Sequence, residues 1–122
     1  MQKNVLLVGL HPDVVDYQKW PELSPEKLLN GLNAGVAALQ AEGIDAAWCL
    51  TDTGETAKQV LSEALKEKQY DVVLVGAGVR TDPEHLVLFE IILNSISELA
   101  PKAKMAFNTS PFDTVEAVKR WL

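Results

Sequence analysis

Apolar and polar residues follow two distinct periods along the chain. Four short apolar runs end in glycine or in a polar residue, which is typical of strands buried in a parallel sheet. They cover residues 4–10, 45–50, 71–75 and 104–108, and the second and fourth are the weaker patterns. Each run is followed by a segment whose apolar residues recur at helical spacing. The pattern therefore predicts strand and helix in alternation, four times over.

Helix-capping signals mark where the four predicted helices begin. Two of the helices open with a cap, a proline and an acid, at Ser24 and at Asp82. The other two open at Asp52 and Asp113, each with a glutamate three residues on, which is capping-box spacing. Gly43 suits the end of the first helix.

This alternation predicts an α/β fold with one parallel sheet and helices on both faces. Right-handed crossovers then favour the strand order 2-1-3-4, a four-stranded, flavodoxin-like three-layer sandwich. No internal repeat, low-complexity segment or linker interrupts the 122 residues. We therefore expect one flavodoxin-like domain over residues 1–122.

The connection between the first strand and the first helix is unusually long. It spans residues 11–23, whereas such connections usually take about 2 to 6 residues. It is either an idle surface insertion or a lid packed over a pocket. Its content, which includes His11, Asp13, Tyr17 and Trp20, favours the lid.

The third predicted helix, residues 83–99, is apolar almost all the way round. A helix on the surface of a domain needs only one apolar stripe. Either neighbouring helices cover the remaining apolar residues, or a second subunit does. We expect a homodimer or a higher oligomer that forms through this helix.

Composition and charge limit the partners of the protein. The net charge is −6 and no cluster of Lys or Arg occurs, which argues against nucleic acid and against an anionic membrane surface. The first apolar run is too short for a signal peptide core or a membrane span. The single cysteine, Cys49, excludes an internal disulfide and fits a reducing compartment. We expect a soluble cytoplasmic protein in which Cys49 is a buried small apolar residue.

The predicted topology places any ligand site at the carboxyl ends of the strands. Ligands bind open parallel sheets where the strand order reverses, which here is between strands 1 and 3. The segments that leave these strands are 9–13 and 76–80, flanked by 51–54 and 108–111. All four turn polar, and three of them contain glycine.

The stretch Val73-Leu74-Val75-Gly76-Ala77-Gly78-Val79-Arg80 is the nearest approach to a binding motif. It is not a standard dinucleotide fingerprint, because a third glycine and a following acid are missing. An anion site is the stronger hypothesis: Gly76 and Gly78 let the backbone approach a ligand, and Arg80 offers two donors to a phosphate or carboxylate. The alternative is a glycine turn with a salt-bridged surface arginine.

Two histidines are candidates for chemistry at this edge. His11 could transfer a proton, oriented by Asp13 or Asp52, or could simply bond to the loop backbone. His85 could be a neutral hydrogen-bond donor at the site or a surface histidine. Asn108 and Ser110 would line one wall and Tyr17 or Trp20 would cover it. No metal is expected, because the two histidines lack ligand spacing, and no cofactor is expected either.

Two resemblances follow from these residues. The order of elements, with Val5-Leu6-Leu7-Val8 and Asp71 to Val75, resembles a response-regulator receiver domain over most of the chain. However, Leu10 and His11 stand where a receiver has its acidic pair, Gly76 stands at the phospho-acceptor position, and the fifth strand is absent. Only Thr109 matches a receiver's hydroxyl after strand 4.

The second resemblance rests on His11-Pro12-Asp13, Trp48-Cys49, Gly76 to Arg80 and Phe107-Asn108-Thr109. These residues are similar to a small family of single-domain, bacterial-type flavodoxin-like proteins whose activity is uncharacterised. The resemblance implies the fold and no activity.

Two functions are therefore predicted. The first is a protein or small enzyme that binds a small anionic metabolite between the ends of strands 1 and 3. The alternative is a non-catalytic, receiver-like interaction module that acts through the helix over residues 83–99.

Overall fold

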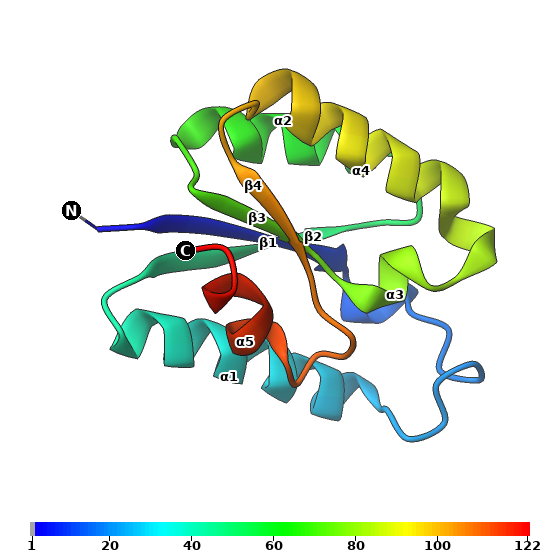
Figure 1. Cartoon of the computed structure of the whole chain (residues 1–122). Helices are drawn as coiled ribbons and strands as arrows, with labels where there is room; N and C mark the ends of the chain where they lie inside the picture. The colour runs from blue at the N-terminus through cyan, green and yellow to red at the C-terminus, as the bar shows by residue number, and fades with distance from the viewer. Residues whose placement is uncertain (1) are drawn as a thin grey trace.

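A four-stranded parallel sheet forms the centre of the computed structural model, which describes residues 2–122 (Figure 1). The strands are β1 (Asn4–Leu10), β2 (Asp45–Thr51), β3 (Val72–Val75) and β4 (Lys104–Phe107). Their order is β2-β1-β3-β4, and every adjacent pair is parallel. The predicted strand order is confirmed.

Helices cover both faces of this sheet, in the three-layer arrangement of a flavodoxin-like fold. Figure 1 shows α1 (Pro25–Ala41) and α5 (Thr114–Lys119) on one face, and α2 (Ala57–Glu67) and α4 (Leu86–Leu99) on the other. Three single turns lie in the connections: η1 (Pro12–Val14), α3 (Ala77–Arg80) and η2 (Pro83–His85). The last two sit between β3 and α4.

Alternate residues of the central strands supply the two halves of the core. Leu6 and Val8 pack on the side of α2 and α4, whereas Val5 and Leu7 pack on the side of α1 and α5. All four are at most 3% exposed. Successive side chains of a strand point to opposite faces, so burial on both faces requires the continuous apolar run that the sequence contains.

α1 begins and ends as its sequence predicts. The Ser24 hydroxyl oxygen accepts a hydrogen bond of 3.2 Å from the Lys27 backbone N–H. At the other end Gly43 has a φ of +79°, and the Ile44 N–H donates to the Leu39 carbonyl oxygen at 3.1 Å. A residue with a side chain is strained at that φ, so glycine closes the helix.

The capping boxes predicted for α2 and α5 do not form, and of the two helices only α5 begins where it is predicted. α2 begins only at Ala57, and Asp52 instead accepts hydrogen bonds from the Gly54 N–H and from the N–H and hydroxyl of Thr56. Asp113 immediately precedes α5 but makes no side-chain capping bond to it; its carboxylate accepts hydrogen bonds from the β4–α5 loop. Both carboxylates accept hydrogen bonds from their own loops at the carboxyl edge of the sheet. These bonds take the place of the capping bonds that the sequence predicts.

α4 begins at Leu86, three residues after the predicted start, because η2 forms the first turn. Leu88, Ile92 and Ile96 are buried in the core cluster that α4 shares with α2 and the strands. Leu86 and Val87 stay 59% and 66% exposed. Neighbours in the same chain therefore cover much of the apolar surface that suggested a second subunit. A homodimer stays a prediction.

A pair of alanine variants can compare what the buried and exposed sides of α4 contribute to stability. We expect Ile92→Ala to lower the free energy of unfolding by about 2–5 kcal/mol, because it leaves a cavity between α4, α2 and the sheet. Val87→Ala, on the exposed side, should change it by less than about 0.5 kcal/mol. Chemical denaturation of both variants measures the difference. Equal losses would contradict the burial of this helix face.

Candidate functional site

A cavity of about 360 Å³ lies at the carboxyl edge of the sheet, where the strand order reverses. Gly9 and Leu10 of β1 line one side of it, and Gly76 and Ala77 at the end of β3 line the other. The location is where the topology of open parallel sheets places ligands. Most of the lining is apolar and comes from α1, the β1–α1 loop, β2 and the β4–α5 loop: Val15, Trp20, Leu23, Leu28, Leu32, Trp48, Pro111 and Phe112.

Glycines keep this cavity open and let its walls approach each other. A Cβ at Gly9 would lie 3.1 Å from Cζ3 of Trp48, so the glycine makes room for the indole ring. The Trp48 Nε1–H donates to the Leu32 carbonyl oxygen at 2.9 Å, which fixes the ring. A Cβ at Gly76 would lie 3.4 Å from the Val8 carbonyl oxygen, whereas one at Gly78 would meet no atom within 4 Å. Gly78 therefore borders open space in the lining.

The β1–α1 loop, residues 11–24, forms one wall of the cavity. Val15, Trp20 and Leu23 of this loop are lining residues. Tyr17 is not among them; its hydroxyl donates to the Pro12 carbonyl oxygen at 2.8 Å and braces the loop internally. The structure therefore favours a wall or lid over an idle insertion, with Trp20 rather than Tyr17 as the covering aromatic residue.

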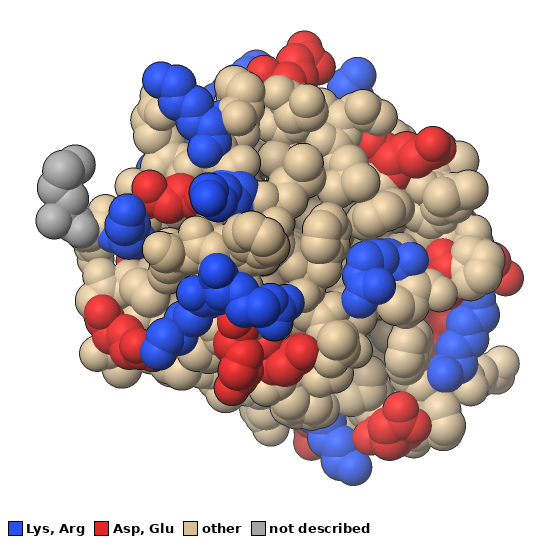
Figure 2. All heavy atoms as spheres, in the orientation of Figure 1, with Lys and Arg blue, Asp and Glu red and all other residues tan. Residues whose placement is uncertain are grey.

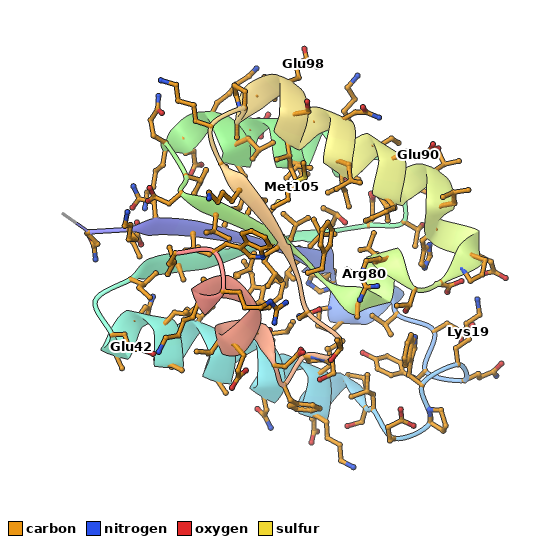
Figure 3. All side chains as sticks on the ribbon, in the orientation of Figure 1. Lys19, Glu42, Arg80, Glu90, Glu98 and Met105 are labelled. Carbon is orange, nitrogen blue, oxygen red and sulfur yellow. The ribbon has the colours of Figure 1, made fainter. Side chains whose placement is uncertain are left out.

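A cluster of charged residues ties this loop to the turn before α4. The Lys19 ammonium, labelled in Figure 3, lies 3.0 Å from Oδ2 of Asp82 and 2.9 Å from Oε2 of Glu84. Asp82 is only 8% exposed and lines the cavity, as does His85, whose Nε2 is 3.6 Å from Oδ2 of Asp82. The remaining hydrogen bonds made by residues 15–23 are local. Lys19 is therefore the polar link from this segment to the rest of the described chain.

Hydrogen bonds set the ionisation of this cluster. The Glu84 backbone N–H, and then the Lys19 ammonium, hold the pKa of the Asp82 carboxyl below its usual range. Hydrogen bonds to Glu84 and then Asp82 raise the pKa of Lys19. A lowered carboxyl pKa keeps the pair ionised at neutral pH, and the link is lost only as the pH falls through that value.

Arg80 lies outside the cavity lining. Figure 3 shows it on α3, and its guanidinium donates to the Asn108 carbonyl oxygen at 2.8 Å and lies 5.9 Å from the centre of the Phe107 ring. Residues two apart on a helix point roughly 200° apart, so a turn that puts Gly78 at the cavity turns Arg80 away from it. The structure therefore gives Arg80 a role in joining α3 to β4, and it does not support Arg80 as an anchor for an anion.

His11, Asp13 and Asp52 are also absent from the lining. Nδ1 of His11 accepts a hydrogen bond from the Asp13 N–H at 3.1 Å, and the Asp13 carboxylate is 3.6 Å from the same nitrogen. The His11 side chain is half exposed and that of Asp13 is largely exposed. The structure therefore agrees with the alternative in which His11 bonds to its own loop backbone, and Asp52 serves its own loop instead of orienting His11.

Asn108 and Ser110 do line the cavity, but their side chains are engaged by the protein. Oδ1 of Asn108 accepts from the Ala77 N–H at 2.8 Å, and Nδ2 donates to the Thr114 hydroxyl oxygen at 3.1 Å. The Ser110 hydroxyl oxygen accepts from the Phe112 N–H at 3.1 Å. Asn108 thus holds α3, β4 and α5 together behind the cavity wall.

Several lining residues were missed from the sequence. Trp48 had one usable signal, a large side chain in a strand that also contains Ala46 and Ala47. Leu28 and Leu32 gave none, because their spacing in α1 is the spacing of ordinary core residues. Asp82 was interpreted as a helix cap, and its place in the cavity depends on how η2 packs.

The charge of the lining differs from the sequence expectation. Asp16, Glu22 and Asp82 are lining residues, and neither Lys nor Arg is among those that line the cavity within residues 2–122. On the face shown in Figure 2, basic and acidic side chains are interspersed over the surface. The described residues contain no group of three or more His, Cys, Asp or Glu placed to hold a metal ion.

Comparison with protein-family models and with curated proteins finds no match to this chain. None of the helices within residues 2–122 has the length and apolar character needed to cross a membrane. The fold and the cavity are therefore the basis for a functional proposal.

The link between Lys19 and Asp82 can be tested by hydrogen exchange. We expect Lys19→Met to raise amide exchange in residues 15–23 about threefold, because the segment loses its polar link to η2. Lys27→Met, on the exposed side of α1, is the matched control and should leave this segment unchanged. Unchanged exchange in the Lys19 variant would show that apolar contacts alone hold the loop.

Cys49 should be unreactive in the folded protein. Burial, and then the Glu67 carboxylate, raise the pKa of its thiol to about 11. At about pH 8 the fraction of thiolate should be roughly 100-fold lower than in the unfolded chain. Labelling with a thiolate-directed reagent should therefore be slower by at least that factor than in denaturant. Comparable rates in the two states would contradict the burial of Cys49.

Proposed function

We propose that this protein binds a small molecule with a largely apolar body in the cavity at the carboxyl edge of its sheet. The observation that carries the proposal is an open space of about 360 Å³, lined mainly by apolar side chains, at the reversal of strand order. Ligand pockets in proteins commonly enclose about 300–1,000 Å³ and are lined in this way.

The β1–α1 loop supports the same proposal. It contributes Trp20 and Leu23 to the lining and is held to η2 through Lys19. A loop of this kind, fixed at one polar contact and apolar on its inner side, can open for a ligand and then exclude water from it.

The proposal concerns binding and not turnover. His85 is the histidine among the lining residues, and its neighbour is the Asp82 carboxylate. The hydroxyl of Ser110 accepts a hydrogen bond from Phe112 and makes none with a histidine. A nucleophile paired with a base, which nucleophilic catalysis requires, is thus not found among the described lining residues.

A second candidate function is an interaction module that acts through α4. It is favoured by Leu86 and Val87, which are the most exposed apolar residues of that helix. Self-association would use the same two residues. We also propose that the chain is related to the small single-domain flavodoxin-like family. A cytoplasmic location is proposed as well, because it fits a single, buried cysteine, Cys49.

The binding proposal can be tested by filling the cavity. A thermal-shift screen of small molecules, followed by tryptophan fluorescence, should find ligands that perturb Trp20 and Trp48. At a ligand concentration 100-fold above its dissociation constant, the stabilisation should be about 2.7 kcal/mol. Gly78→Leu should weaken such binding at least about tenfold, because the new side chain enters open space at position 78.

Two controls accompany this variant. Gly78→Ala adds one methyl group and should weaken binding less, and Ala34→Leu adds the same side chain on the exposed side of α1. Both variants at position 78 should fold, because the backbone there does not require glycine. Saturable binding that is equal in wild type and Gly78→Leu would place the ligand elsewhere. A screen without any saturable binding would refute the proposed function.

A further inference from the structure

The Asp and Glu residues that line the cavity are not matched by any Lys or Arg among the described lining residues. Asp16, Glu22 and Asp82 line it, and the ammonium of Lys19, on the β1–α1 loop, pairs with Asp82 (Figure 3). Lys19 is already shared between the carboxylates of Asp82 and Glu84, at 3.0 and 2.9 Å. Its ammonium is therefore committed to the protein and does not offset the other carboxylates.

Glu22 is the carboxylate most available to a ligand. It lines the cavity and makes no hydrogen bond and no ion pair within residues 2–122. Asp16 is partly engaged, because its Oδ1 accepts from the Gln18 N–H at 3.0 Å. The rim of the cavity thus holds negative charge without a partner in the protein.

The interior of the cavity adds a second and independent preference. Trp20, Trp48 and Phe112 all contribute to the lining. The face of an aromatic ring attracts a cation, tryptophan most strongly, and the attraction grows when water is excluded. The Trp48 ring is held in place by its hydrogen bond to Leu32.

An anionic ligand would find the opposite conditions. It would approach carboxylates and aromatic rings, and it would meet neither Lys nor Arg among the described lining residues. A charge that leaves water without a partner is strongly disfavoured. Arg80, on which the expectation of an anion depends, is not a lining residue, and its guanidinium donates to the Asn108 carbonyl oxygen.

We infer that the cavity selects an organic cation, an ammonium group attached to an apolar or aromatic body. The ammonium group lies where the rim carboxylates of Glu22 and Asp16 meet the aromatic lining, and the body fills the remaining apolar space. This inference rests on the proposed function and adds the chemical class of the ligand.

Three probes with the same apolar body test the inference: phenethylammonium, phenethyl alcohol and hydrocinnamate. We expect calorimetry on the wild-type protein at neutral pH to find phenethylammonium bound at least about tenfold more tightly than the alcohol. Hydrocinnamate should bind most weakly. The advantage of the cation over the alcohol should shrink at high salt, because the rim carboxylates are exposed.

Variants identify the source of the selectivity. Glu22→Gln should weaken phenethylammonium about threefold and leave the alcohol unchanged, and adding Asp16→Asn should weaken the cation further. Glu26→Gln, an exposed acid in the first turn of α1 outside the lining, is the matched control and should change neither probe.

The outcomes separate this inference from the proposed function. Equal binding of the three probes, or tightest binding of hydrocinnamate, overturns the inference of a cation while binding in the cavity stands. A preference for the cation that Glu22→Gln and Asp16→Asn leave intact overturns the assignment to the rim. Absence of binding by all three probes also overturns the inference of a cation. The proposed function is refuted only if the small-molecule screen with the Gly78→Leu variant fails as well.

Discussion

The pairing of β1 with β3 is the constraint on which the rest of the structure depends. Residues 5–8 pair in parallel register with residues 72–75, and all eight are almost fully buried. The chain leaves β1 toward α1 on one face of the sheet, and it leaves β3 toward α3 and α4 on the other (Figure 1). Because the two connections diverge, they leave a space between them at the carboxyl edge, and the β1–α1 loop forms one wall of it. The cavity is a consequence of this divergence.

The protein then shapes that opening with a few close contacts. The absence of a side chain at Gly9 leaves room for the Trp48 ring, and at Gly76 it lets the backbone of β1 come close. The Asn108 side chain hydrogen-bonds to both Ala77 and Thr114. These contacts make the walls rigid with polar groups that are themselves satisfied. What is left for a ligand is apolar surface beneath a loop and carboxylates at its rim, and the proposal of a cationic ligand rests on these two features.

A single helical turn decides which charged residues line the cavity. From the sequence, Arg80 follows two glycines at the end of a strand, and an anion cradle is a reasonable hypothesis. In the fold, residues 77–80 form one turn of helix, so Arg80 faces β4 and packs on Phe107. The carboxylate of Asp82, interpreted from the sequence only as a cap, lies in the cavity lining.

The sequence by itself determined the order of strands, the layers of helices and the edge at which a site could form. These features follow from local periodicity, caps and the handedness of crossovers, and each is readable from neighbouring residues. Tertiary structure alone decided which side chains meet at that edge. Lys19 and Asp82 are 63 residues apart, and Arg80 and Asn108 are 28 apart. Contacts over such separations depend on how loops and single turns pack on the finished sheet, and no local pattern encodes them.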